Sequence, residues 1–171
     1  ISRNIFVICK TKMARSITRR TLIGFRQCKV NLHAFDDLLN QVKNNKESFV
    51  KNITRPKFWN IKNSNNMLKF NAVVGNPPYQ LTVAQKDTEN GQKRVSSIFH
   101  LFQILADQVG RYTSLIYPGI RWIHRSGKGL EQFGLQQIND THLSKLYFYP
   151  NANEIFDKVS IADGITIVLK D

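Results

Sequence analysis

Hydrophobic and polar residues follow two different periods along this chain, and each period predicts one kind of element. Apolar positions three or four residues apart predict amphipathic helices. Short apolar runs that end at turn residues predict strands. The predicted helices cover 12–25, 96–109 and 131–139, and the predicted strands cover 4–9, 30–35, 72–74, 112–117, 144–149 and 165–169.

The order of these elements predicts the fold class. Strand 4–9, helix 12–25 and strand 30–35 have the spacing of a βαβ unit, whose strands are parallel by default. Strands and helices keep alternating after it, so we expect an α/β fold, with its third strand buried. Ligands of such sheets bind beyond the carboxyl ends of the strands, where Asp36 and Asn76 are expected.

Two polar stretches interrupt this pattern. Residues 41–68 are rich in Asn and Lys and are expected to be mostly loop. Within them, Phe58 and Trp59 either anchor the loop to the core or stack on nucleic acid. Residues 81–95 are also polar and contain an Asn-Gly turn signal, which predicts a second loop.

The positive charge is concentrated in the first part of the chain. The net charge is +13, and residues 1–70 hold 15 Lys and Arg against 3 acids, which leaves +12 there and +1 in the remainder. A basic face of this kind attracts phosphate backbones without reading their sequence. On helix 12–25, the candidates either contact phosphates or form a solvated face: Arg15, Arg19, Arg20 and Arg26.

Length and composition exclude several classes of protein. With 171 residues, 42% of them hydrophobic, the chain is long enough for one domain with a sizeable core. It begins at Ile1, so we expect a piece of a longer protein. No apolar run reaches the length of a membrane span, so no membrane partner is expected. Cys9 and Cys28 lack metal-ligand spacing, which predicts reduced thiols, a cytoplasmic location and no metal site.

The candidate chemistry centres on the corner that follows the third predicted strand. Gly75 permits a sharp turn, and Asn76 supplies a side-chain acceptor. Pro77 and Pro78 each fix φ and lack an N–H, so the corner is stiff and its carbonyl oxygens have no backbone donors beside them. Beside the ring of Tyr79, two such acceptors suit a flat ligand with an exocyclic amine.

The string Val-Val-Gly-Asn-Pro-Pro-Tyr-Gln at 73–80 resembles motif IV of the DNA amino-methyltransferases, in particular the adenine-specific modification methylases of type II restriction–modification systems, including fused enzymes. The resemblance implies a partial Rossmann-like, S-adenosylmethionine-dependent methyltransferase sheet that is mostly parallel and ends in an antiparallel hairpin. It implies catalytic roles for Asn76, Pro77, Pro78 and Tyr79. In the family, the Asn side chain and the first Pro carbonyl accept hydrogen bonds from the adenine amine, and the Tyr stacks on the flipped base.

Later segments carry the resemblance further. Residues 120–122 and 127–130 resemble the family's Pro-Ser-Arg-Trp and Gly-Lys-Gly-Leu segments, and 155–164 resembles its Ile-Phe, Val-x-Ile-x-Gly-Gly block. In that block the resemblance places Phe156 against the flipped base, with an ordinary apolar anchor as the alternative. It places Phe102 beside the cofactor adenine, with a core position as the alternative.

The resemblance also implies contacts to cofactor and DNA. An acid after strand 30–35 holds the adenine amino group of S-adenosylmethionine in the family, and Asp36 is the matching residue. Its alternative role is to cap the helix that follows. The cations expected to meet the DNA backbone are Lys86, Lys93, Arg94, Arg121 and Lys128.

Two departures from the family concern the cofactor. Cys9 or Lys10 stands where the family has an acid that holds the cofactor ribose, and neither side chain accepts a pair of hydroxyl hydrogen bonds as a carboxylate does. The family's first strand and its Gly-containing cofactor loop should precede Ile5 and are absent. We therefore expect this chain to be inactive by itself.

Together, these observations predict a fragment, 1–171, of a methyltransferase catalytic domain, with a basic βαβ part and polar loop at 1–69 and the catalytic corner and hairpin at 70–171. The expected reaction moves a methyl group from S-adenosylmethionine to the exocyclic amine of a flipped adenine in double-stranded DNA. A target-recognition domain and a nuclease domain are candidate partners in the full-length protein. The alternatives are methylation of RNA or protein amino groups, or a non-catalytic DNA-binding remnant.

Overall fold

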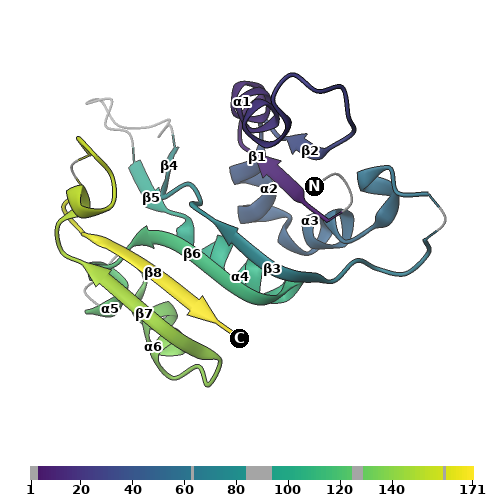
Figure 1. Cartoon of the computed structure of the whole chain (residues 1–171). Coiled ribbons are helices and arrows are strands. Elements are labelled where there is room, and N and C mark those ends of the chain that lie inside the picture. The colour runs from purple at the N-terminus through teal and green to yellow at the C-terminus, as the bar shows by residue number, and fades with distance from the viewer. Residues whose placement is uncertain (1–3, 63, 84–93, 125–128, 160) are drawn as a thin grey trace. The chain divides into compact units, whose positions relative to one another are not determined.

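The computed structural model describes residues 4–62, 64–83, 94–124, 129–159 and 161–171 (Figure 1). The chain separates into two compact units, Ile1–Leu68 and Lys69–Asp171. Each unit has its own strands, helices and buried residues. None of the described helices combines the length and the apolar composition that crossing a membrane requires.

The first unit begins with the predicted βαβ arrangement. β1 (Phe6–Cys9) and β2 (Asn31–Ala34) pair in parallel, which confirms the prediction for this segment. α1 (Lys12–Ile23) connects them. Thr11 caps the start of α1 by accepting a 3.0 Å hydrogen bond from a first-turn N–H, and Gly24, with φ of 61°, ends the helix.

The expectation of a mostly loop-like stretch over 41–68 is wrong. α2 (Leu38–Asn44), α3 (Lys46–Ile53) and the 3₁₀ turn η1 (Pro56–Trp59) occupy much of it. The apolar side chains of these helices are few but regularly spaced, and the many Asn and Lys residues between them hid the helical period. The buried ones are Leu38, Val42, Phe49 and Ile53.

Trp59 anchors this stretch to the first unit. Its side chain is 2% exposed, and its Nε1 donates a 2.6 Å hydrogen bond to the carbonyl of Ile53. Its ring packs edge-on against Phe6 and His33, with centroids 5.1 and 5.0 Å apart. Because the ring is enclosed on these sides, the anchoring alternative is correct for Trp59 and stacking on nucleic acid is excluded.

The second unit contains a four-stranded sheet in the order β3-β6-β8-β7 (Figure 1). β3 pairs with β6 in parallel, and β8 pairs with both β6 and β7 in antiparallel fashion, so β8 alone runs against the other three strands. This mixed arrangement confirms the antiparallel hairpin at the end of the chain and is compatible with a methyltransferase-like fold. The strands are β3 (Phe70–Gly75), β6 (Gly110–Pro118), β7 (Leu143–Tyr149) and β8 (Ile165–Lys170).

Three helices pack against one face of this sheet. They are α4 (Phe99–Val109), α5 (Ile120–Ile123) and α6 (Glu131–Ile138). Each contributes at least one aromatic residue to a cluster that also includes side chains from β6 and β8. Burial of this apolar surface is the main stabilising contribution to the unit. Its largest members are Phe99, Leu115, Tyr117, Trp122, Leu130 and Phe133.

β3 is less buried than the sequence predicts. Val73 packs against the core cluster, whereas Ala72 and Val74 are exposed, Val74 at 75%. Alternate residues of a strand point to opposite faces, so the two exposed residues lie on the face that no described helix of this unit covers. The continuous apolar run predicts burial on both faces, whereas the described helices of this unit cover only one.

A hairpin replaces part of the second predicted loop. β4 (Gln80–Val83) and β5 (Arg94–Ser97) pair in antiparallel fashion, and α4 begins at Phe99, three residues later than predicted. The rest of that loop, 84–93, lies outside the described residues. A second 3₁₀ turn, η2 (Ala152–Glu154), follows β7.

Candidate active site

The candidate site is the corner that joins β3 to β4. β3 ends at Gly75, which is paired with Leu115 of β6. Asn76 follows immediately and is exposed, whereas Pro77 is buried and Pro78 is half-buried. The stiff part of the corner is therefore fixed by packing, while the amide side chain of Asn76 is presented to solvent.

The corner is also held by the hairpin that follows it. The carbonyl of Tyr79 accepts a 3.0 Å hydrogen bond from the N–H of Ile98, and Gln80 pairs with Ser97 one step further along. This ladder ties the corner to Ile98, the residue just before α4, which is only 1% exposed. Within the described ranges, no N–H bonds the carbonyl of Pro77, as expected when two prolines remove the local donors.

Tyr79 is half-buried and packs against the core cluster of the second unit. Its hydroxyl is buried and lacks a well-formed hydrogen bond. Burial raises the pKa of the Tyr79 phenol, and the neighbouring Asn76 side chain partly offsets that rise. The phenol is therefore neutral at physiological pH, and its ring is positioned by packing.

The corner contains two consecutive hydrogen-bond acceptors, the exposed Asn76 amide and the carbonyl of the buried Pro77, close in sequence to the aromatic ring of Tyr79. The Asn76 side-chain oxygen and the Pro77 carbonyl have no charge and do not take up protons near neutral pH. They can accept hydrogen bonds from an amine but cannot remove its proton as a general base does. The chemistry that this corner supports is the orientation and electrostatic stabilisation of an amino group.

The two aromatic residues expected around the substrate and the cofactor belong to the same unit as the corner. Phe102 lies on α4 and is half-buried, three residues after the core residue Phe99. Phe156 is also half-buried and follows η2, where its N–H bonds the carbonyl of Ala152 at 2.9 Å. Both rings keep some exposed surface, so their roles in binding stay predictions.

The expected DNA-backbone cations differ in what the structure describes of them. Arg121 lies on α5, and its Nε donates to Asp163 at 2.8 Å, so one edge of its guanidinium is already engaged. Arg94 lies in β5, but its side chain is outside the described part of the chain. Lys86, Lys93 and Lys128 lie outside the described residues altogether.

Asp36, the expected cofactor ligand, belongs to the first unit, just after the carboxyl end of β2. Its side chain is 75% exposed, and its nearest ion-pair partner is Lys12 at 4.0 Å. Asp37, not Asp36, holds the N-cap position of α2, and it makes no side-chain cap bond; its carboxylate instead accepts a 2.8 Å hydrogen bond from Gln41. The capping alternative for Asp36 therefore fails, and its carboxylate remains accessible.

The residues around Asp36 fit one end of S-adenosylmethionine and not the other. An exposed carboxylate at this edge is suited to an adenine amino group. At the end of β1, however, Cys9 is buried with its Sγ 3.9 Å from the Thr18 hydroxyl, and Lys10 is exposed. Neither residue supplies a carboxylate for the ribose hydroxyls.

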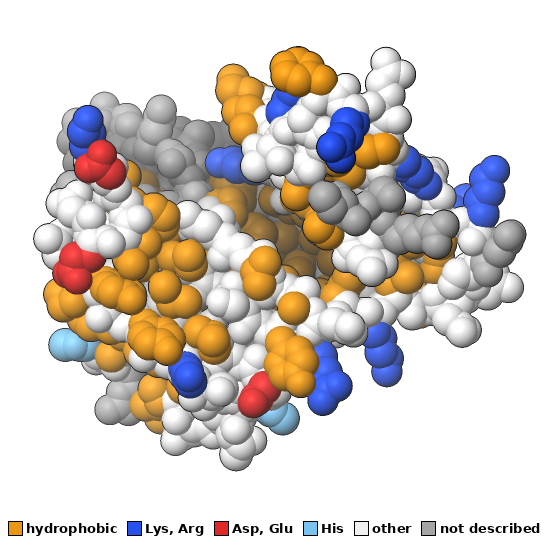
Figure 2. Space-filling view, in the orientation of Figure 1, with side chains coloured by type: hydrophobic (Ala, Val, Ile, Leu, Met, Phe, Trp, Pro, Cys, Tyr) orange, Lys and Arg blue, Asp and Glu red, His pale blue; other side chains and the backbone are white. Residues whose placement is uncertain are grey.

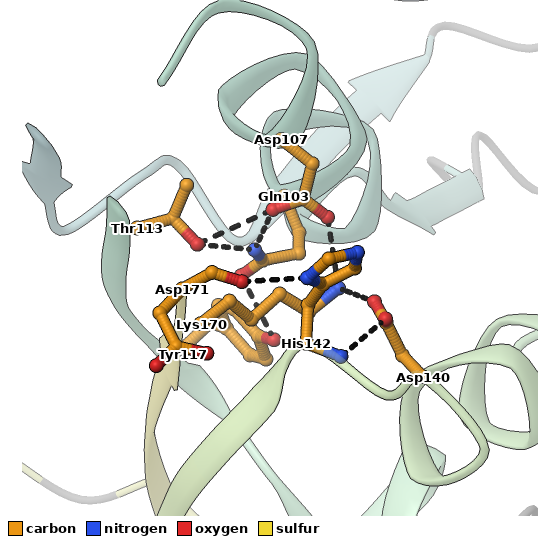
Figure 3. Close-up of polar contacts among 8 residues, drawn as sticks. All are labelled: Gln103, Asp107, Thr113, Tyr117, Asp140, His142, Lys170 and Asp171. Atoms are coloured by element: carbon orange, nitrogen blue, oxygen red, sulfur yellow. Dashed lines mark hydrogen bonds and ion pairs between the residues drawn. The ribbon is translucent and has the colours of Figure 1, made fainter. Parts of the chain in front are cut away.

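Sequence reasoning missed a buried polar network in the second unit (Figure 3). Lys170, 5% exposed at its side chain, lies between Asp107 at 2.9 Å and Asp140 at 2.6 Å. Asp107 also accepts from Gln103 at 2.7 Å and from Thr113 at 3.2 Å. The i, i+4 spacing of Gln103 and Asp107 on α4 was the only local signal, because the other members come from distant parts of the chain.

This network connects α4, β6, β8 and the turn before β7. The Tyr117 hydroxyl donates to Gln103 at 3.2 Å, and burial, together with the charge of Asp107, raises the pKa of that phenol. The hydrogen bond from Lys170 lowers the pKa of Asp140, assisted by the N–H of His142. These groups satisfy one another, so we assign the network a structural role.

Comparison with known proteins places this chain in a family. The family model described as Eco57I restriction-modification methylase matches residues 3–156, which cover most of both units and the whole β3–β4 corner but not β8. No curated protein matches the chain. Because the matched region covers most of the sequence, the chain belongs to the Eco57I restriction-modification methylase family.

Proposed function

We propose that this chain carries the catalytic corner of an adenine-specific DNA methyltransferase in a restriction–modification system. Membership of a methylase family supports methyl transfer as the reaction class. The observation that carries the finer proposal is the β3–β4 corner, where Asn76 is exposed beside a proline carbonyl with no described N–H donor. Such a pair of acceptors matches the two hydrogens of an exocyclic amine.

Asn76 and Pro77 act on the amine in this proposal. An aromatic amine is a weak nucleophile because its lone pair is delocalised into the ring. Two hydrogen bonds from the amine to the Asn76 oxygen and the Pro77 carbonyl favour a tetrahedral nitrogen, whose lone pair is free to attack. The same acceptors stabilise the positive charge that grows on the nitrogen, so the attack needs no strong base. Once the nitrogen carries the methyl group and a positive charge, it is acidic and loses its extra proton to water.

Tyr79 and Phe156 hold the base in this proposal. The amine of a paired adenine is inaccessible in the duplex, so the nucleotide must leave the stack. Stacking on an aromatic ring offsets part of that cost, by about 1–3 kcal/mol per base. Tyr79 is suited to this because packing against the core fixes its ring. Phe156 is assigned the opposite side of the base.

S-adenosylmethionine, when bound, supplies an activated methyl group to the amine. Among this chain's residues, we assign Asp36 to the cofactor adenine amino group and Phe102 to contact with its ring. The absence of a ribose-binding carboxylate at Cys9 and Lys10 favours a second candidate, a DNA-binding remnant without catalysis. Calorimetric titration of the intact protein with cofactor separates the two, because the remnant gives no binding heat.

The decisive test of the corner is Asn76→Ala in the intact protein. We expect methyl transfer to DNA to fall by at least about 100-fold, since an interaction made mainly in the transition state is lost. DNA binding should stay near wild type because the side chain is exposed and the contact recorded for it is with the Tyr79 hydroxyl. Labelled methyl incorporation and DNA affinity, measured on the same preparation, check both expectations.

Retained transfer by purified Asn76→Ala protein refutes the assignment of the corner. The matched control is Asn71→Ala, which removes an exposed amide from the same strand, five residues before the corner. That variant should keep its activity. Offering DNA, RNA and protein as acceptors in parallel reactions also tests the alternative that the corner serves a different amino-group substrate.

A further inference from the structure

A basic pocket lies at the carboxyl end of α1 and in the segment that leads to β2. Arg19, Arg20, Phe25, Gln27 and Lys29 line a shallow cavity of about 500 Å³. We call it the α1-end pocket. Figure 2 shows basic and hydrophobic side chains side by side at the surface over α1. None of the residues that line the pocket is acidic.

The charge around this pocket is one-sided over a long stretch of chain. The first acid in the sequence is Asp36, and residues 1–35 contain eight Lys and Arg. For the described residues of this stretch, the structure records an ion pair between Lys12 and Asp36, whose nitrogen and oxygen atoms are 4.0 Å apart. A potential of one sign over a shallow, solvated pocket attracts a polyanion.

Arg20 is positioned by an exposed aromatic ring. Its guanidinium carbon lies 4.2 Å from the centroid of the Phe25 ring, while the Phe25 side chain is 85% exposed. A guanidinium stacked in this way is restricted in orientation but keeps its N–H edge free. That edge has the fork geometry that binds two oxygens of one phosphate.

The other two cations of the pocket are held by backbone carbonyls. Arg19 donates to the carbonyl of Arg26 at 3.4 Å, and Lys29 donates to the carbonyl of Asn60 at 2.8 Å. Each bond uses one donor of a side chain that has several, so both cations keep donors for a ligand. Holding the side chains in place reduces the entropy lost when a ligand binds.

The α1-end pocket is separate from the candidate cofactor residue. β1 and β2 are parallel, so α1 returns the chain to the amino ends of these strands before β2 begins at Asn31. Asp36 follows the carboxyl end of β2, at the opposite edge of the pair. Within this unit, the α1-end pocket and the candidate cofactor ligand Asp36 are therefore two different sites.

We propose that the α1-end pocket is a second, sequence-independent contact site for the phosphodiester backbone of duplex DNA. The three cations bind phosphate oxygens and release counterions from the DNA, and no base edge is read. The site deepens the proposed function, since it rests on DNA being the substrate, but it does not depend on the chemistry at Asn76. Its role is to raise affinity for any DNA segment.

A membrane surface fits the pocket less well. The lining offers one large apolar side chain, Phe25, and Arg20 already covers one face of its ring. Binding to lipid through an amphipathic helix requires a broad apolar face that inserts between the headgroups. Within this pocket, the cations outnumber the apolar groups, which favours a polyanion in water.

The test compares DNA affinity across a range of salt concentrations, using fluorescence anisotropy with a labelled duplex of random sequence. The variant is the triple substitution Arg19→Gln, Arg20→Gln and Lys29→Gln in the intact protein. The plot of log affinity against log salt should lose roughly 2–3 units of slope, about one for each phosphate contact removed, and affinity should fall at least tenfold.

The matched control removes the same charge from exposed lysines that do not line the pocket: Lys43→Gln, Lys51→Gln and Lys145→Gln. Equal losses in slope and affinity for the two triple variants would overturn the site, because net charge alone would then account for binding. Phe25→Ala tests the platform without removing charge and should also weaken binding, whereas Phe25→Tyr should keep it. Circular dichroism on each variant checks that it folds. If the triple variant does not fold, Phe25→Ala takes its place, because the ring of Phe25 is almost fully exposed and its removal should not disturb the fold.

Two further measurements separate this site from other outcomes. If the triple variant binds vesicles of anionic phospholipid less tightly but DNA equally well, the partner is a lipid surface and the proposal is wrong. If the Asn76→Ala protein keeps the full slope of log affinity against log salt, its DNA contact is intact. A loss of methylation in that variant then concerns the corner and not the α1-end pocket. A triple variant that still methylates DNA at low salt, but with an affinity that falls less steeply as salt increases, supports the proposal.

Discussion

Asn76 and Tyr79 lie in the same corner but differ in how far their side chains contribute to the fold. Asn76 is exposed, and the contact recorded for its side chain is with the hydroxyl of Tyr79. Tyr79 packs against the core, so substitution there affects stability as well as stacking. A useful variant at Tyr79 must therefore separate the ring from its hydroxyl.

Tyr79→Phe should preserve both stability and methyl transfer. The hydroxyl is buried without a well-formed hydrogen bond, so its removal should change the free energy of unfolding by less than about 1 kcal/mol. Tyr79→Ala removes half-buried ring contacts and should cost about 2 kcal/mol and most of the activity. Urea unfolding and methyl incorporation measure the two effects. Loss of activity in Tyr79→Phe would show that the hydroxyl acts in the reaction.

His100 should make the second unit sensitive to acid. Burial lowers the pKa of His100 below 6.5, and its Nδ1 is buried without a hydrogen-bond partner. The unfolded chain then binds a proton at a higher pH than the folded chain does. Stability should therefore be complete above about pH 6.5 and decline as the pH falls toward the folded pKa. Unfolding free energies of wild type and His100→Leu, compared at several pH values, test this; parallel profiles would contradict it.

At the scale of elements, β8 is held in place both by backbone pairing and by a side-chain network. Its backbone pairs with β6 and β7, and Lys170 at its end reaches Asp107 and Asp140. A buried cation between two carboxylates contributes only while both partners remain ionised. The network therefore joins the end of the sheet to α4 in a way that depends on pH.

Lys170→Met should destabilise the second unit by about 2 kcal/mol at neutral pH, because Asp107 and Asp140 lose their shared cation. The pKa of Asp140 is lowered mainly by its hydrogen bond from Lys170, so the stabilisation from Asp140 exists above the ordinary value of 3.8 and fades as the pH falls through the folded value. Urea unfolding at neutral and strongly acidic pH should show the mutational cost shrinking on acidification. An unchanged cost at both pH values would rule out this account.

The sequence predicted some elements and not others, for physical reasons. The βαβ start follows from local apolar periods, the final antiparallel hairpin follows from the family resemblance, and the structure has both. α3 was missed because Phe49 and Ile53 are isolated among polar residues. The exposed face of β3 was missed because an apolar run does not say which face a helix covers.

The candidate site follows the same division. The corner at Asn76 was predictable because proline chemistry is local, whereas the engagement of Arg121 by Asp163 links residues 42 apart in sequence. The stacking of Arg20 on Phe25 was also invisible, since an exposed Phe gives no periodic signal. Long-range pairing is what periodicity and motifs do not encode.

At the scale of the whole chain, the two units differ in charge and in proposed task. The first carries nearly all of the +13 net charge and the α1-end pocket. The second carries the corner and the apolar core. In this account the first unit supplies affinity for DNA that is sensitive to salt, and the second supplies the chemistry.

The most direct test of the central claim is to identify the methylated atom. The intact protein is incubated with duplex DNA and S-adenosylmethionine that carries a labelled methyl group, and the DNA is digested to nucleosides for mass spectrometry. The account predicts label on the exocyclic nitrogen of adenine, absent with Asn76→Ala. Label on cytosine, on RNA or on protein would contradict it. The absence of any label, in a preparation that binds S-adenosylmethionine, would contradict it as well.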